Sequence, residues 1–168
     1  MATIIMTKIK LTLVFLLIAT VTFAQKSPRN QATGQVGDVA VSIDYGAPSV
    51  KERVIWGGLE KYGKVWRAGA NENTTIAFDK DVKIGETTVP AGKYGFFIIP
   101  NEDEDWVVIF NKKNDGWGAY SYNKDDDIVR LTIIRKFVDE NQEMLMYEVG
   151  EKGINFAWEK ARLLIPVN

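Results

Sequence analysis

The side chains best suited to bind a ligand lie in and just after one irregular stretch, residues 48–70. The stretch has weak periodicity and several glycines, and the side chains in question are Lys51, Arg53, Trp66, Arg67, Asn71 and Glu72. An arginine can fork onto a carboxylate or a phosphate. Asn71 and Glu72 can hydrogen-bond sugar hydroxyls, with Trp66 as a stacking surface. These residues therefore form the first candidate ligand site.

A structural role for the same residues stays open. The arginines could pair with nearby acids and hold this stretch, which we call the arm, over the end of the fold, with Trp66 in the core. The acids in question are Asp44, Glu52 and Glu72.

A second candidate is the aromatic string of Trp117, Tyr120 and Tyr122, in which Trp117 lies between two glycines. Amphipathic rings on a glycine-rich loop are typical of binding surfaces. Trp117 and Tyr120 differ in parity, so strand alternation alone does not explain them. Either the string binds a ligand, or Trp117 closes one end of the fold.

Acidic residues offer two further chemistries. Glycoside hydrolysis needs two facing carboxylates, and Glu72 is the only acid of the candidate cluster and has no identifiable partner. Glu148 and Glu159 are expected to face solvent. The acidic runs 102–105 and 125–127 do not match the spaced calcium loop of an EF-hand, and we expect them to keep loops solvated. We therefore assign no catalytic residue, no metal site and no cofactor.

Composition removes much other chemistry, because the chain has no histidine and no cysteine. Ser-His-Asp and Cys-His catalysis, thiol chemistry, disulfides and the usual zinc and haem ligand sets are excluded. The sequence thus favours a binding protein over an enzyme.

Residues 1–24 have the pattern of a signal peptide. Lys8 and Lys10 precede an uncharged apolar run, and Thr22-Phe23-Ala24 places small residues at a cleavage site. Removing the two lysines leaves 19 basic against 22 acidic residues, a net charge of −3. We expect an exported protein, periplasmic or extracellular in a Gram-negative bacterium, with no membrane span after cleavage and no affinity for nucleic acid. Its oligomeric state is open.

Hydrophobic residues alternate with a period of two through most of the chain, which predicts strands. The expected strands are 39–45, 75–78, 82–84, 87–89, 93–99, 106–110, 128–137, 144–149 and 154–158, with a four-residue loop at 150–153. About eight or nine short strands predict an all-β fold, an antiparallel β-sandwich or flattened barrel. Residues 36–168 would form this single domain, after a flexible start at 25–35. The arm at 48–70 would be long and ordered, with one short helical turn.

The last segment changes phase. Ile154, Phe156 and Trp158 hold even positions, whereas Leu163 and Ile165 hold odd ones. A β-bulge near residues 159–160 would keep both sets on the core face. The alternative is a short helix over residues 158–164.

Three stretches carry a resemblance to a known family. They are residues 45–75, with the string Val65-Trp-Arg-Ala-Gly-Ala-Asn-Glu72, then Val89 to Pro100, and Gly116-Trp-Gly-Ala-Tyr-Ser-Tyr122. Residues 36–167 resemble the domain of unknown function 2911 family, small exported bacterial β-proteins. Members often have proline where this chain has Glu60. The resemblance implies export and a β-rich fold, and it implies no activity.

These observations predict a non-catalytic domain that binds a glycan or another cell-envelope component through the arm and residues 116–122, the Trp117 loop. A structural or protein-interaction domain of the envelope is the first alternative. A hydrolase that uses acidic residues is the second.

Overall fold

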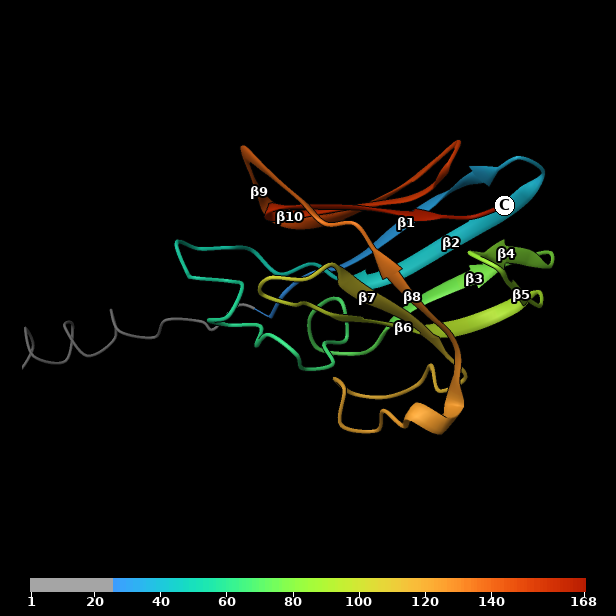
Figure 1. Ribbon diagram of the computed structural model, residues 1–168, viewed down its shortest axis with the longest axis horizontal. Coiled ribbons are helices and arrows are strands. Elements are labelled where there is room, and N and C mark those ends of the chain that lie inside the picture. The colour runs from blue at the N-terminus through green and yellow to red at the C-terminus, as the bar shows by residue number, and fades with distance from the viewer. Residues whose placement is uncertain (1–25) are drawn as a thin grey trace, which may run out of the picture.

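The structure is a computed structural model that describes residues 26–168, and its regular secondary structure is almost wholly β-strand (Figure 1). The expected signal peptide lies outside the described residues. The strands are β1 (Arg29–Val36), β2 (Val39–Gly46), β3 (Thr74–Phe78), β4 (Val82–Ile84), β5 (Thr87–Val89), β6 (Gly92–Ile99), β7 (Trp106–Asn111), β8 (Asp127–Ile133), β9 (Lys136–Gly150) and β10 (Gly153–Pro166). One short 3-10 helix, η1 (Lys124–Asp126), precedes β8. The predicted all-β fold is confirmed.

Six strands form one antiparallel sheet in the order β1-β2-β3-β6-β7-β8. Apolar residues alternate along its strands, so one face of the sheet is apolar and points into the core. On this face Ile43 lies opposite Ile76, and Ile76 lies opposite Tyr94. β1 and β8 are its two edges. β4 and β5 form a separate two-stranded hairpin.

The long β9–β10 hairpin is the second layer and lies over the inner face of the main sheet (Figure 1). β9 runs beside β1, where a β-carbon on Gly34 would lie 2.7 Å from the Val149 side chain. At the opposite side β8 pairs with β7 alone and β10 with β9 alone, so the fold is a sandwich that does not close.

The predicted phase change in β10 is confirmed. Trp158 is buried on one side of the change and Ala161 on the other, and the pairing with β9 shifts between Ala157 and Ala161. Glu159 sits at the shift with a φ of 51°. The strand continues to Pro166, so the alternative helix over 158–164 is wrong. The bulge keeps both sets of apolar residues on the core face, which explains why the strand continues through this segment.

Four tryptophans form an aromatic cluster at one end of the core. Trp66 stacks on Trp158 with ring centroids 5.4 Å apart, and Trp56 packs against Trp158 at 5.5 Å and Trp106 at 4.4 Å. Two of these rings belong to the arm and two to strands. The arm is therefore part of the core and not an appendage.

The arm is ordered without a helix. Ser49 forms a β-bridge with Met144 of β9, and Trp66 forms one with Ile98 of β6. The backbone N–H of Trp66 donates to the Ile98 carbonyl at 2.8 Å. The predicted excursion is confirmed, and the predicted helical turn is wrong. Lys51 and Glu52 instead make a turn with φ angles of 49° and 57°.

Three boundaries differ from the prediction. The expected flexible start at 25–35 is wrong from Arg29 onward, because β1 pairs with β2 over its full length. The run 128–137 is two strands, interrupted at residues 134–135. Gly150 pairs with Gly153, so the last hairpin has a two-residue loop. Within residues 26–168 no helix is long and apolar enough to cross a membrane.

Candidate ligand-binding surface

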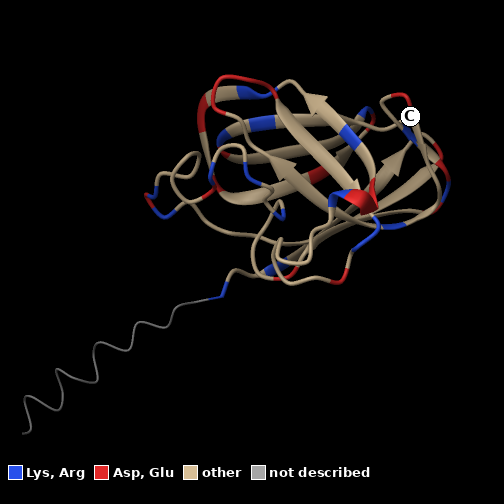
Figure 2. Ribbon diagram, turned by 60° about the horizontal axis from the view of Figure 1, so that its bottom comes forward, with Lys and Arg blue, Asp and Glu red and all other residues tan. Residues whose placement is uncertain are grey.

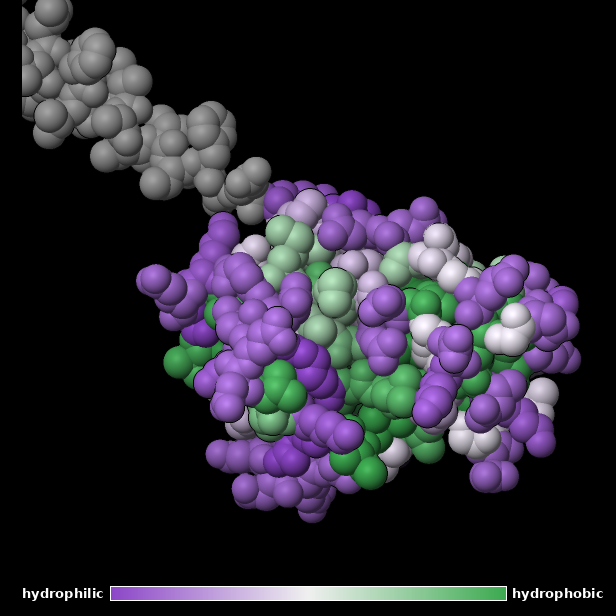
Figure 3. Space-filling view, turned by 90° about the horizontal axis from the view of Figure 1, so that it is seen from above, coloured by the Kyte–Doolittle hydropathy of each residue, from purple (hydrophilic) through white to green (hydrophobic). Residues whose placement is uncertain are grey.

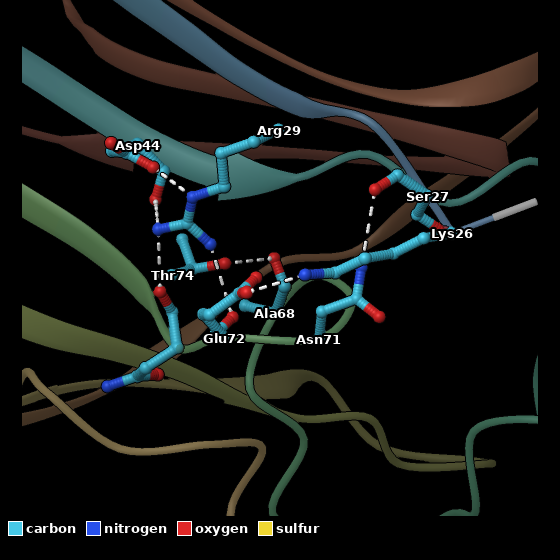
Figure 4. A network of polar contacts seen from close by, with 9 residues as sticks. Lys26, Ser27, Arg29, Asp44, Ala68, Asn71, Glu72 and Thr74 are labelled. Carbon is cyan, nitrogen blue, oxygen red and sulfur yellow. Dashed lines mark hydrogen bonds and ion pairs between the residues drawn. The ribbon is translucent and has the colours of Figure 1, made fainter.

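A polar network fastens the N-terminal segment to the end of the arm (Figure 4). The Arg29 guanidinium pairs with the Asp44 carboxylate and donates to the backbone carbonyls of Glu72 at 3.2 Å and Asn73 at 2.9 Å. Lys26 Nζ donates to Glu72 Oε1 at 2.7 Å. The network therefore holds Glu72 from both its backbone and its side chain.

The chain turns tightly behind this network. Asn71 has a φ of 63°, and its side-chain amide donates to the Ser27 carbonyl at 3.2 Å. The Thr74 hydroxyl donates to the Ala68 carbonyl at 3.1 Å. These side-chain bonds to backbone acceptors fix an irregular segment that has no strand ladder of its own.

Gly46, the last residue of β2, packs directly against the backbone of this turn at Ala70. A β-carbon there would lie 2.0 Å from the Ala70 carbonyl oxygen, which is backbone and cannot move aside cheaply. We expect Gly46→Ala to lower the free energy of unfolding by about 1 to 3 kcal/mol through overpacking. Calorimetry of the two proteins measures this difference.

Gly37→Ala is the matched control. Gly37 has a φ of 60°, and a β-carbon on it would meet no atom within 4 Å, so its substitution carries only the left-handed backbone cost of about 1 kcal/mol. If Gly46→Ala cost no more than Gly37→Ala, the packing of the arm against β2 would be wrong.

The Trp117 loop attaches to the same network. Glu72 forms a β-bridge with Trp117, Asn73 N–H donates to the Gly116 carbonyl at 3.0 Å, and Gly118 N–H donates to the Asn71 carbonyl at 3.0 Å. The arm and the loop, which are about forty-five residues apart in sequence, thus share one surface.

Trp117 is 55% exposed and borders a concave site of about 300 Å³, the Trp117 hollow. The Lys26 ammonium lies over its ring, 5.2 Å from the centroid. Most of the remaining lining consists of amide and charged side chains, namely Arg29, Glu72, Asn73, Lys93, Asn114 and Asp115. An exposed indole beside several fixed hydrogen-bonding groups has the composition of a site for a polar ligand with one apolar face.

A second concave site of about 310 Å³, the basic hollow, has Lys26 in its lining. Its lining includes Lys51 and Arg53, together with Ser49 and Met144. Arg53 is held by hydrogen bonds to the carbonyls of Ser49 at 2.5 Å and Val50 at 3.0 Å. Lysine and arginine on its lining, without an acidic residue, favour negatively charged groups.

The Glu72 carboxylate is held in its ionised form. The hydrogen bond from Lys26 is the main reason that its pKa lies below the usual range, and the attraction of Lys26 and Arg29 adds to it. An acid that stays ionised is a poor proton donor, so Glu72 is suited to accept hydrogen bonds from hydroxyl groups.

The nine candidate residues fall into distinct places. Glu72 and Trp117 meet at the Trp117 hollow, and Lys51 and Arg53 lie at the basic hollow. Asn71 does not line either hollow, but its carbonyl accepts a hydrogen bond from Gly118 N–H next to Trp117. Trp66 is 3% exposed, and its indole N–H donates to the Gly69 carbonyl, so it is a core residue and not a stacking surface.

The other three candidates do not line the Trp117 hollow. Arg67 is half-buried beside Gly118, and its buried Nε makes no hydrogen bond to another described residue. Tyr120 is 92% exposed. Tyr122 donates to Asp127 at 2.7 Å and accepts from Arg130 at 2.8 Å. Burial and the Asp127 carboxylate raise the pKa of Tyr122 to about 12, so it acts as a fixed structural donor.

Sequence reasoning missed Lys26 and Arg29 at the site, since the N-terminal segment shows no apolar alternation. Asn73, directly after Glu72, was missed as well. It also missed Glu60, a carboxyl group whose pKa is raised by burial to about 7 although Arg67 and Arg53 oppose the rise. No signal in the local sequence points to that burial. Among residues 26–168, no three acidic side chains gather where they could hold a metal ion.

Comparison with known proteins places this arrangement in a family. The family described as "Protein of unknown function (DUF2911)" matches residues 27–167, which is nearly every residue that the structure describes. The chain belongs to DUF2911. No curated protein and no solved structure gave a match. The DUF2911 match covers the arm and the Trp117 loop together, so both parts of the candidate surface fall within the family region.

In this DUF2911 chain the backbone N–H and carbonyl of Glu60 both form hydrogen bonds. Glu60 N–H donates to the Ile55 carbonyl at 2.9 Å, and its carbonyl accepts from Gly57 at 2.8 Å. A proline at this position would lose the first of these hydrogen bonds. Charged residues of both signs are interspersed along the chain, in loops and within strands (Figure 2).

Proposed function

We propose that this protein is an exported, non-catalytic binding protein that holds a cell-envelope glycan at the Trp117 hollow. The observation that carries the proposal is the exposed Trp117 ring beside fixed polar side chains at a concave surface. A pyranose presents an apolar C–H face that stacks on an indole and a ring of hydroxyls that need donors and acceptors.

The lining supplies those groups. Arg29 and Lys93 can donate, the Glu72 and Asp115 carboxylates can accept, and the Asn114 amide can do both. Arg29 and Glu72 are already held by the polar network, so little conformational entropy would be lost when a sugar binds. The basic hollow beside Lys26 would favour a glycan that carries a negatively charged substituent.

Two observations favour binding over hydrolysis at this surface. Glu72 is ionised through its contact with Lys26, and the carboxyl group with the raised pKa, Glu60, does not line the Trp117 hollow. A hydrolase needs a protonated acid and a second carboxylate on either side of the bond to be cleaved.

A thermal-shift screen tests the proposal. The purified protein is heated with soluble envelope glycans and polysaccharide fragments, neutral and anionic. A ligand at about 100 times its dissociation constant adds about 2.7 kcal/mol of stability, a rise of several degrees. We expect a shift with at least one glycan, and we expect Trp117→Ala to abolish it.

Tyr120→Ala is the matched control, because Tyr120 is more exposed than Trp117, lies three residues away and does not line the hollow. It should keep the shift. Equal loss in both variants would contradict the site, and the absence of any shift across the panel would contradict the function.

A further inference from the structure

The open side of the sandwich carries an apolar groove that the glycan surface does not use. It lies between β8 and β10, the two strands that lack a partner on that side, and encloses about 530 Å³. We name it the β8–β10 groove. Its apolar lining consists of Leu131, Ile133, Ile134, Leu163, Leu164 and Pro166.

Part of the apolar lining of the groove is exposed to solvent. Ile133 and Leu163 are buried at its floor, whereas Leu164 is 42% and Ile134 is 69% exposed. Seen from the side of the β9–β10 hairpin, apolar side chains gather across the middle of the molecule within a polar rim (Figure 3). A concentrated apolar patch of this kind on a soluble fold marks a binding site.

The rim gives the chemistry of the occupant. Its charged side chains are Lys136 and Arg162, and no acidic residue lines the groove. Neither cation takes part in an ion pair with another residue of 26–168. A ligand that fits this rim carries a negative charge.

Arg162 is held in place with donors to spare. Nη1 donates to the carbonyls of Glu159 and Ala161, both at 3.0 Å, and Nη2 donates to the Glu140 carbonyl at 2.9 Å. Of the five guanidinium N–H groups, Nε–H and one on Nη2 make no hydrogen bond to a described residue. Two donors on one guanidinium can bind a carboxylate bidentately.

We propose that the β8–β10 groove binds a single-chain fatty-acid carboxylate. The acyl chain would lie along the apolar lining, and the carboxylate would pair with Arg162 and Lys136 at the rim. The volume lies within the range of about 300 to 1,000 Å³ for sites that take one small ligand, which favours one acyl chain over a two-chain lipid. The groove shares no lining residue with the Trp117 hollow, so the two proposals are independent.

The test uses a dansyl-labelled undecanoic acid, whose fluorescence rises in an apolar site, with palmitate as the competitor. We expect the probe to bind the full protein and palmitate to displace it. Arg162→Gln should weaken palmitate about tenfold, the loss expected for a charge-assisted hydrogen bond, and should leave the neutral analogue hexadecanol unchanged.

Leu164→Gln and Met146→Gln form the matched pair. Both side chains lie on the β9–β10 hairpin and are 42% exposed, but only Leu164 lines the groove. Leu164→Gln should weaken the probe, and Met146→Gln should not. Circular dichroism confirms that each variant is folded.

Three results would overturn the proposal. The first is failure of the folded wild-type protein to bind the probe. The second is binding that both groove variants retain. The third is cosedimentation with phosphatidylglycerol vesicles that depends on Leu164 while palmitate fails to compete, which would identify a membrane contact instead.

Discussion

Trp158→Ala is expected to lower the free energy of unfolding by about 3 to 5 kcal/mol, the usual loss for a buried large aromatic residue. Trp158 is fully buried, stacks on Trp66 at 5.4 Å with an interplanar angle of 20°, and contacts Trp56 at 5.5 Å. Its removal leaves a cavity between the arm and β10. In a domain of this size each kcal/mol is worth about 2 to 4 °C, so a melting point lower by about 10 °C is expected in calorimetry.

Phenylalanine substitutions separate the contribution of the buried aromatic ring to stability from that of the indole N–H hydrogen bond. The Trp158 N–H is buried and makes no hydrogen bond to another described residue, whereas the Trp106 N–H donates to the Asn101 carbonyl at 3.0 Å. Both rings are fully buried. Trp158→Phe should therefore cost less than Trp106→Phe, which also loses a hydrogen bond worth about 1 kcal/mol. The reverse order would contradict the assigned partners.

Most strands could be predicted because burial on one face of a sheet imposes alternation. β2 is the clearest case, since Val41 and Ile43 are buried between less buried neighbours. β1 could not be predicted for the same reason. Its residues Arg29 to Gln35 are at most half-buried, because it is an edge strand, and an edge strand whose side chains stay partly in solvent leaves no hydrophobic period in the sequence.

The candidate surface was predictable in part. Glu72 and Trp117 stand out as polar and aromatic residues on irregular backbone, and the structure brings them together through a β-bridge. Their partners Lys26 and Arg29 lie more than forty residues before Glu72, and their approach depends on how β1 pairs with β2. Local patterns do not encode such long-range contacts.

Glu60 shows the same limit with a measurable consequence. Its carboxyl group is largely buried, which raises its pKa from 4.5 to about 7, and the positive charges of Arg67 and Arg53 hold it from rising further. A carboxyl group whose pKa is raised by folding binds its proton more tightly in the folded state than in the unfolded chain. Ionisation of Glu60 therefore opposes folding.

The pH dependence follows with a definite sign. Well below pH 4.5 Glu60 is protonated in both states and makes no difference to the free energy of unfolding. Between pH 4.5 and about 7 the folded state holds more protons, so this contribution to stability falls as the pH rises, by about 3 kcal/mol in total. Above about pH 7 the loss is complete.

Glu60→Gln removes this titration while keeping the backbone N–H that donates to Ile55. We expect the variant to become more stable relative to the wild-type protein as the pH rises from 4.5 to 7.5, with the difference in the free energy of unfolding growing by about 3 kcal/mol. Urea denaturation at a series of pH values measures it. The control is Glu148→Gln on the exposed face of β9, whose difference from the wild-type protein should stay nearly constant. A constant difference for Glu60→Gln as well would mean that the Glu60 carboxyl group is solvated in the folded protein, and that the arm packs less closely around it than the structure shows.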